Sequence, residues 1–143
     1  MSNQCARLSK RIAPRRTKHE VGIVMRAVWI HAHLNSERFA AKAEILHRKG
    51  IEDYAKYLYR RAAKLEFVAF EGIGPDKTRT KGIIGVSAVC LWLKSGDLEI
   101  SEVLAQSMLM DESMPEFIID DLCDILLTIQ NRKEQEANLK SDT

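Results

Sequence analysis

The chain has 143 residues, of which 45% are hydrophobic and 29% charged, a balance typical of a folded single domain rather than a disordered chain. Its longest stretch without a charged residue, 82–93, is well short of the roughly 20 residues that a helix needs to span a bilayer. The three cysteines, Cys5, Cys90 and Cys123, form no Cys-x-x-Cys pair. This argues against a disulfide framework or a structural zinc and predicts a reducing, cytoplasmic environment.

The first 17 residues are polar and basic and are interrupted by Pro14. We interpret them as a flexible basic arm with solvated charges, although a transit segment of the mitochondrial type has a similar composition. The bases that precede the first acidic residue, Glu20, are Arg7, Lys10, Arg11, Arg15, Arg16 and Lys18.

The segment that follows predicts a helix over 18–34. Its apolar residues recur at spacings that place them on one helix face. They are Val21, Val24, Met25, Val28, Trp29 and Ala32. We expect this stripe to face the core, and Asn35 or Ser36 to cap the next helix.

Two helices joined at Gly50 are predicted over 36–69, with bounds near 37–49 and 52–70. A glycine at this place ends a helix at little cost, because it readily takes the left-handed conformation. The two stripes mix small and large residues, with Phe39, Ala43 and Leu46 in the first helix and Ala55, Tyr59 and Ala62 in the second.

This order of aromatic, small and large residues resembles a tetratricopeptide repeat, a helical hairpin of 34 residues. With Ser36 as the first position, the six residues fall where that family packs its two helices together. Two residues depart from the family pattern: Lys42 stands where a leucine is usual, and Phe67 where a proline often closes the unit.

A second, weaker repeat is similar to the first over 82–115, with helices near 81–94 and 98–110 joined at Gly96. A loop over 70–81 separates the two repeats. Aligned on the two glycines, the second repeat matches the pattern at Ala88, Trp92, Ser101 and Ala105 and departs from it at Gly85, Val89 and Met108.

The last predicted helix, 114–131, begins at a capping box formed by Ser113 and Glu116, with Pro115 in the first turn. Tetratricopeptide arrays commonly end in such a helix, because the last repeat needs a cover for its apolar side. Residues 132–143 are interpreted as a polar tail. The expected fold is therefore an all-α monomer of six helices: one domain over 18–131, built as a short stack of antiparallel hairpins between an N-terminal and a C-terminal helix.

The resemblance implies a non-catalytic module or adaptor that binds another protein or peptide in the groove lined by the first helix of each repeat. The implied groove residues are Glu37, Ala41, Glu44, His47 and Arg48 in the first repeat and Ser87, Cys90 and Lys94 in the second. Lys94, His47 and Arg48 suit an acidic partner, but the full residue set of a carboxylate clamp is missing.

An alternative function is association with nucleic acid through the basic arm, residues 1–18, and the lysine and arginine residues of 48–64. Steep salt dependence of binding would reveal it. Lys77, Arg79 and Lys81 add to this alternative, because bases at a helix start are disfavoured unless an anion is present. Self-association is compatible with every alternative.

A less favoured alternative is a HEPN-type ribonuclease, since Arg26 and His31 match that family's Arg-x4-His spacing; Ala27 stands where a polar residue usually follows the arginine. His31 and His33 lie on different helix faces, so we expect no metal and no cofactor. No Ser-His-Asp order or other catalytic constellation is recognisable, and we expect no enzyme.

Overall fold

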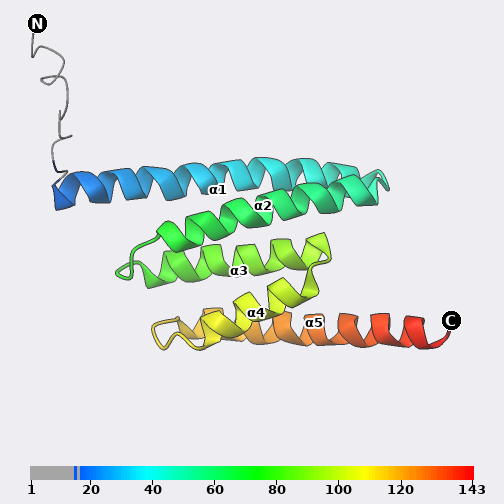
Figure 1. The fold of residues 1–143 in the computed structure, drawn as a ribbon. Helices are drawn as coiled ribbons and strands as arrows, with labels where there is room; N and C mark the ends of the chain where they lie inside the picture. Colours follow the sequence, from blue (N-terminus) through cyan, green and yellow to red (C-terminus); the bar gives the residue numbers. More distant parts are fainter. Residues whose placement is uncertain (1–14, 16) are drawn as a thin grey trace, which may run out of the picture.

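The computed structural model describes residues 15 and 17–143, which form five helices and no strand. The helices are α1 (Lys18–Arg48), α2 (Glu52–Gly72), α3 (Thr78–Ser95), α4 (Leu98–Leu109) and α5 (Glu116–Ser141). They stack in chain order, each packed on the next, and α5 also contacts α3 (Figure 1). The expected all-α class is confirmed for this part of the chain.

One continuous helix, α1, replaces the two helices predicted over 18–34 and 37–49. Ser36, expected to start a helix, lies inside α1, where its Oγ donates to the carbonyl oxygen of Ala62 in α2 at 2.9 Å. The hydroxyl therefore finds its acceptor on a neighbouring helix instead of ending its own. The real cap is Thr17, whose side chain forms a capping box with Glu20.

The N-terminal part of α1 extends past the end of α2 (Figure 1). Ala32 is buried and Trp29 is half-buried, but Val21, Val24 and Val28 are 45%, 39% and 52% exposed. The expected core-facing stripe is thus wrong for these three valines, because α2 ends at Gly72, beside Trp29. The side chain of Met25 lies outside the described residues.

Two turns with the same hydrogen bonds join α1 to α2 and α3 to α4. Gly50 and Gly96 have φ values of +77° and +87°, as the expected left-handed helix ends require. In each turn the amide after the glycine donates back to a helix carbonyl: Ile51 N to Leu46 O at 2.9 Å, and Asp97 N to Trp92 O at 3.1 Å. This is the Schellman arrangement.

The main core contains the small residues expected between the helices. Ala43, Ala55 and Ala62 are at most 1% exposed and belong to the same cluster as Tyr59. The matching positions of the second hairpin are buried in that cluster or beside it: Ala88, Trp92, Ser101 and Ala105. Their burial explains the residue pattern, whichever family the chain resembles.

The α2–α3 loop and both ends of α5 differ from expectation. The loop is confined to residues 73–77. Pro115 is the N-cap of α5, and the predicted capping box is absent, because Ser113 N and Oγ both donate to Asp111 at 2.9 and 2.6 Å. Most of the segment interpreted as a polar tail, 132–143, is helical, since α5 continues to Ser141.

Candidate interaction site

A polar cavity of about 450 Å³ opens at the end of the stack where the two glycine turns lie. We call it the turn-end pocket. Four helices contribute its lining, which consists of Glu44, His47, Glu52, Ala55, Lys56, Tyr59, Lys94 and Arg132. The α1–α2 turn places the end of α1 beside the start of α2, and α3 and α5 supply one cation each.

The acidic side chains of the turn-end pocket are bonded within the chain. Tyr59 donates its hydroxyl to Glu44 Oε2 at 2.7 Å, and Arg48 Nη2 lies 3.3 Å from Glu44 Oε1. Glu52 Oε1 lies 2.9 Å from His47 Nδ1. The hydrogen bond from Tyr59 lowers the pKa of Glu44, while burial and the same bond raise the pKa of Tyr59 to about 12.

The cations of the turn-end pocket remain available. Within the part of the chain that the structure describes, Lys56, Lys94 and Arg132 have no carboxylate at ion-pair distance. Lys94 Nζ lies 5.6 Å from the centre of the Tyr59 ring, and Arg132 Nη1 donates to Leu93 O at 3.4 Å. With both glutamates already engaged, the pocket presents an excess of positive charge to an incoming group.

The structure brings together only some of the predicted groove residues. Glu44, His47 and Lys94 line the turn-end pocket, and Arg48 joins it through Glu44. Glu37, Ala41, Ser87 and Cys90 lie outside its lining. Burial raises the pKa of the half-buried Cys90 thiol, which makes it a poor nucleophile.

The predicted groove set missed five of the eight residues that line the pocket: Glu52, Ala55, Lys56, Tyr59 and Arg132. Arg132 was assigned to a polar tail, although the strong helix formers of 132–140, with no glycine or proline among them, were a signal that α5 continues. Tyr59 was expected in the core, where its ring does lie, but its hydroxyl reaches the pocket.

Those of the basic residues proposed for nucleic acid that the structure describes do not converge on one site. Arg79 lies over Phe117 and Lys81 over Phe70, each 5.0 Å from the ring centre, whereas Lys77 lines a separate cavity of about 290 Å³. In the arm, Arg15 is exposed, as is Lys18 at the start of α1. Arg7, Lys10, Arg11 and Arg16 lie outside the described residues.

The two residues of the ribonuclease pair do not line a common cavity. Arg26 lines the 290 Å³ cavity beside Lys77, while His31 is exposed, lies outside that lining and has its Nε2 3.3 Å from Asn35 Nδ2. Among the described residues, no three histidine, cysteine, aspartate or glutamate side chains are placed to hold a metal ion.

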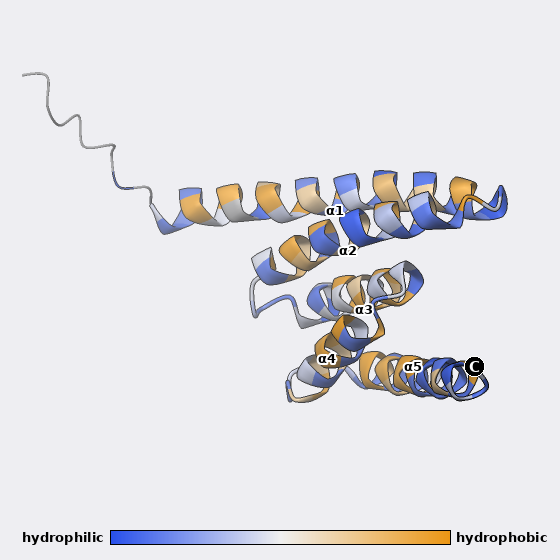
Figure 2. Cartoon of the chain, turned by 45° about the vertical axis from the view of Figure 1, so that its right-hand side comes forward, coloured by the Kyte–Doolittle hydropathy of each residue, from blue (hydrophilic) through white to orange (hydrophobic). Residues whose placement is uncertain are grey.

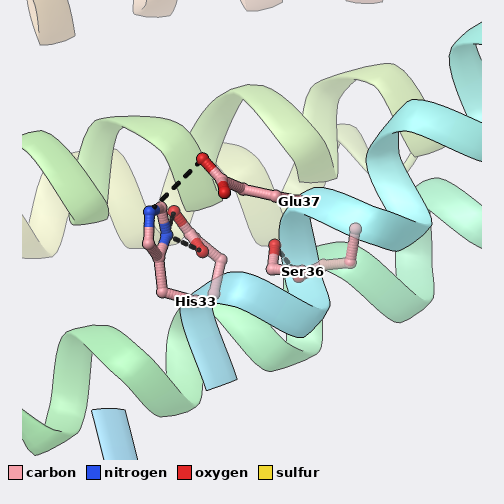
Figure 3. Close-up of polar contacts among 5 residues, drawn as sticks. His33, Ser36 and Glu37 are labelled. Carbon is pink, nitrogen blue, oxygen red and sulfur yellow. Dashed lines mark hydrogen bonds and ion pairs between the residues drawn. The ribbon is translucent and has the colours of Figure 1, made fainter. Parts of the chain in front are cut away.

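A buried carboxylate links α1 to α2 (Figure 3). Glu66 is 1% exposed, and both of its oxygens lie 3.0–3.1 Å from His33 Nδ1. The other ring nitrogen, Nε2, lies 3.5 Å from Glu37 on the next turn of α1. This contact was not predicted, although Glu66 falls between the buried Ala62 and Ala69 on the inner face of α2, where a lone acid needs a partner.

A second, apolar groove of about 550 Å³ runs between α2, α3 and α4. Its lining includes Phe67, Phe70, Trp92, Ile100 and Val103, together with the acids Glu71 and Glu99. Val103 is 65% exposed. No sequence pattern singled out this groove.

Over the described residues, no helix combines the length and the apolar character needed to cross a membrane. Comparison with protein-family models, with curated proteins and with solved structures found no match to this chain.

Proposed function

We propose that this chain is a non-catalytic protein-interaction module, a small tetratricopeptide-like adaptor that binds its partner at the turn-end pocket. The observation that carries the proposal is the balance of paired and unpaired charged side chains in this pocket. Its two glutamates are bonded within the chain, and among the described residues Lys56, Lys94 and Arg132 have no carboxylate at ion-pair distance. We infer that the partner presents an acidic side chain or a free C-terminal carboxylate.

The repeated turn supports the tetratricopeptide-like architecture. Gly50 and Gly96 carry the same conformation and are followed by the same backward hydrogen bond. The small residues that the family pattern calls for are buried between the helices. The α1–α2 and α3–α4 pairs are then two versions of one hairpin, the second with a different distribution of side-chain volume, and α5 is the helix that covers the last hairpin.

The test is peptide binding, measured by fluorescence anisotropy with a library of acidic peptides that carry free or amidated C-termini. We expect Lys94→Glu to weaken binding by about 10- to 100-fold, the effect of losing a charge-assisted hydrogen bond. Lys140→Glu, a charge-matched change near the end of α5 and outside the pocket lining, is expected to leave binding unchanged.

Two results would overturn the proposal. One is equal loss of peptide binding in both variants, which indicates only a general charge effect. The other is RNA cleavage by the purified protein that disappears in Arg26→Ala or His31→Ala, because the chain would then be a nuclease.

A further inference from the structure

The helix α1 is apolar on two faces, and the residues that the structure describes cover only one of them. Its inner face packs on α2 through Ala32, Ser36 and Ala43. A second set of residues, the outer face, recurs at helical spacing on the other side: Ile23, Ala27, Ile30, Leu34, Ala41 and Ile45. All six are exposed, Ile23 by 51%, Leu34 by 48% and Ile45 by 52%.

An exposed apolar face of this kind indicates a surface that packs against a partner. An apolar stripe on a helix normally packs against another element, whereas α1 lies at the edge of the stack and carries hydrophobic residues, interleaved with polar ones, along its length (Figure 2). We propose that the outer face is a homodimer interface on which α1 of a second copy packs in the antiparallel direction.

The spacing of the outer face matches such a partner. Ile23 and Ile45 lie at equal distances before and after Leu34, and so do Ala27 and Ala41. A two-fold axis at Leu34 therefore brings isoleucine opposite isoleucine, alanine opposite alanine and leucine opposite leucine, while Ile30 lies opposite the exposed Arg38. The stretch of α1 that forms this interface, from Ile23 to Ile45, is about 33 Å long, at 1.5 Å per residue.

The charges favour the antiparallel direction. A parallel pair brings together two copies of the segment 1–19, each with six bases and no acid. The antiparallel pair separates them by the length of α1, about 45 Å, far beyond the screening length of about 8–10 Å. It also brings Glu20, near the start of α1, close to Lys49 at the end of the partner's α1, and it aligns the two helix dipoles favourably.

Sedimentation equilibrium of the full chain tests the interface. We expect a dimer that Leu34→Glu converts to a monomer, since two carboxylates would then meet at the two-fold axis. Because Leu34 is half exposed within one chain, the circular dichroism spectrum should not change. The melting temperature should fall only to the value that the parent shows when it is diluted to the monomer. Ala27→Glu is expected to act in the same way. Val103→Glu, which places the same charge in the apolar groove, should leave the dimer intact.

Cysteine cross-linking tests the direction, in a background carrying Cys5→Ser, Cys90→Ala and Cys123→Ser. Leu34→Cys alone should form a disulfide dimer on oxidation. Ile23→Cys alone should not, whereas Ile23→Cys combined with Ile45→Cys should. A parent chain that is monomeric at every concentration overturns the proposal, as does a dimer that Val103→Glu breaks and Leu34→Glu spares. Cross-linking of Ile23→Cys alone overturns the antiparallel arrangement.

Discussion

At the scale of single residues, the Tyr59–Glu44 pair shows how one side chain serves both the core and the pocket. The ring of Tyr59 is 5% exposed and packs in the main core, while its hydroxyl donates to Glu44 at the wall of the turn-end pocket. A hydrogen bond between a buried hydroxyl and a carboxylate holds both groups in place. Glu44 is thereby less available to compete with a ligand for Lys94.

The raised pKa of Tyr59 predicts a loss of stability in alkaline solution. In the unfolded chain tyrosine ionises near pH 10.0, and in the folded chain Tyr59 ionises near 12. Its contribution is complete below the unfolded value and disappears as pH rises through the folded value, a loss of roughly 2–3 kcal/mol. Denaturant unfolding across this window should show the loss in the parent and not in Tyr59→Phe.

The exposed Tyr57 is the matched control, and Tyr57→Phe should keep the alkaline loss of the parent. A stability difference between the parent and Tyr59→Phe that stays constant through this pH window would contradict the assignment.

At the scale of helices, apolar contacts hold two helices together, whereas polar contacts fix how they are aligned. Apolar packing holds α1 and α2 together, while Glu66 requires one particular alignment, because its carboxylate is buried and reaches His33 on the facing helix. The hydroxyl of Ser36 adds a second fixed contact one turn later (Figure 3). Together they set the register of α1 on α2.

Removing the histidine should destabilise the α1–α2 pair strongly. His33→Ala leaves Glu66 buried without its partner, at a cost of about 3 kcal/mol in the free energy of unfolding. The double variant His33→Ala with Glu66→Leu should recover most of that loss, since no unpaired carboxylate remains. Chemical denaturation of the four proteins of this cycle measures the coupling, and His31→Ala, on the exposed side of α1, is the control. If the losses in the free energy of unfolding of the two single variants add up in the double variant, His33 and Glu66 act independently.

In the first hairpin a large side chain on the first helix lies at the position paired with a small one on the second helix, and in the second hairpin the two sizes are exchanged. Gly85 and Met108 are at the positions that Phe39 and Ala62 occupy in the first hairpin. A Cβ atom added to Gly85 would overlap the end of the Met108 side chain and lie 2.9 Å from the Phe70 ring. In the second hairpin the large residue is on the second helix, and the glycine on the first helix leaves room for the methionine side chain.

An alanine at this glycine should therefore destabilise the fold by overpacking, by roughly 1–3 kcal/mol. Gly22→Ala is the matched control, since no atom lies within 4 Å of its added Cβ and the change improves helix propensity. Thermal melts should show a lower midpoint for Gly85→Ala and an equal or higher one for Gly22→Ala. Equal midpoints for the Gly85 variant and the parent would show that Met108 and Phe70 can move aside.

At the scale of the whole molecule, the core ends within α5 while the helix continues. Ile129 is fully buried against Leu93 and Leu98, and the residues after it are exposed except the partly buried Lys133, which pairs with Glu102 of α4. The expected domain end at 131 therefore falls near the last core residue. The helical extension beyond it supplies Arg132 to the turn-end pocket.

Truncation after Asn131 should leave a folded protein with a free energy of unfolding lower by about 1 kcal/mol, the scale of a surface ion pair. By contrast, Ile129→Ala should cost about 2–5 kcal/mol, because it opens a cavity in the core. The truncated chain should also bind acidic peptides more weakly, since Arg132 is lost. A truncated chain that fails to fold would place part of the core beyond Asn131.

Local chemistry alone determined the helical class, the two glycine turns and the small residues between the helices. These follow from the sequence because helix periodicity and the left-handed glycine depend on residues close together in the chain. The tertiary structure decided the rest. Ser36 continues α1 because its acceptor is on α2, and Val21 and Val28 stay exposed because α2 stops short of them. The convergence of Lys94 and Arg132, and the pairing of Glu66 with His33, depend on how helices far apart in sequence lie in space.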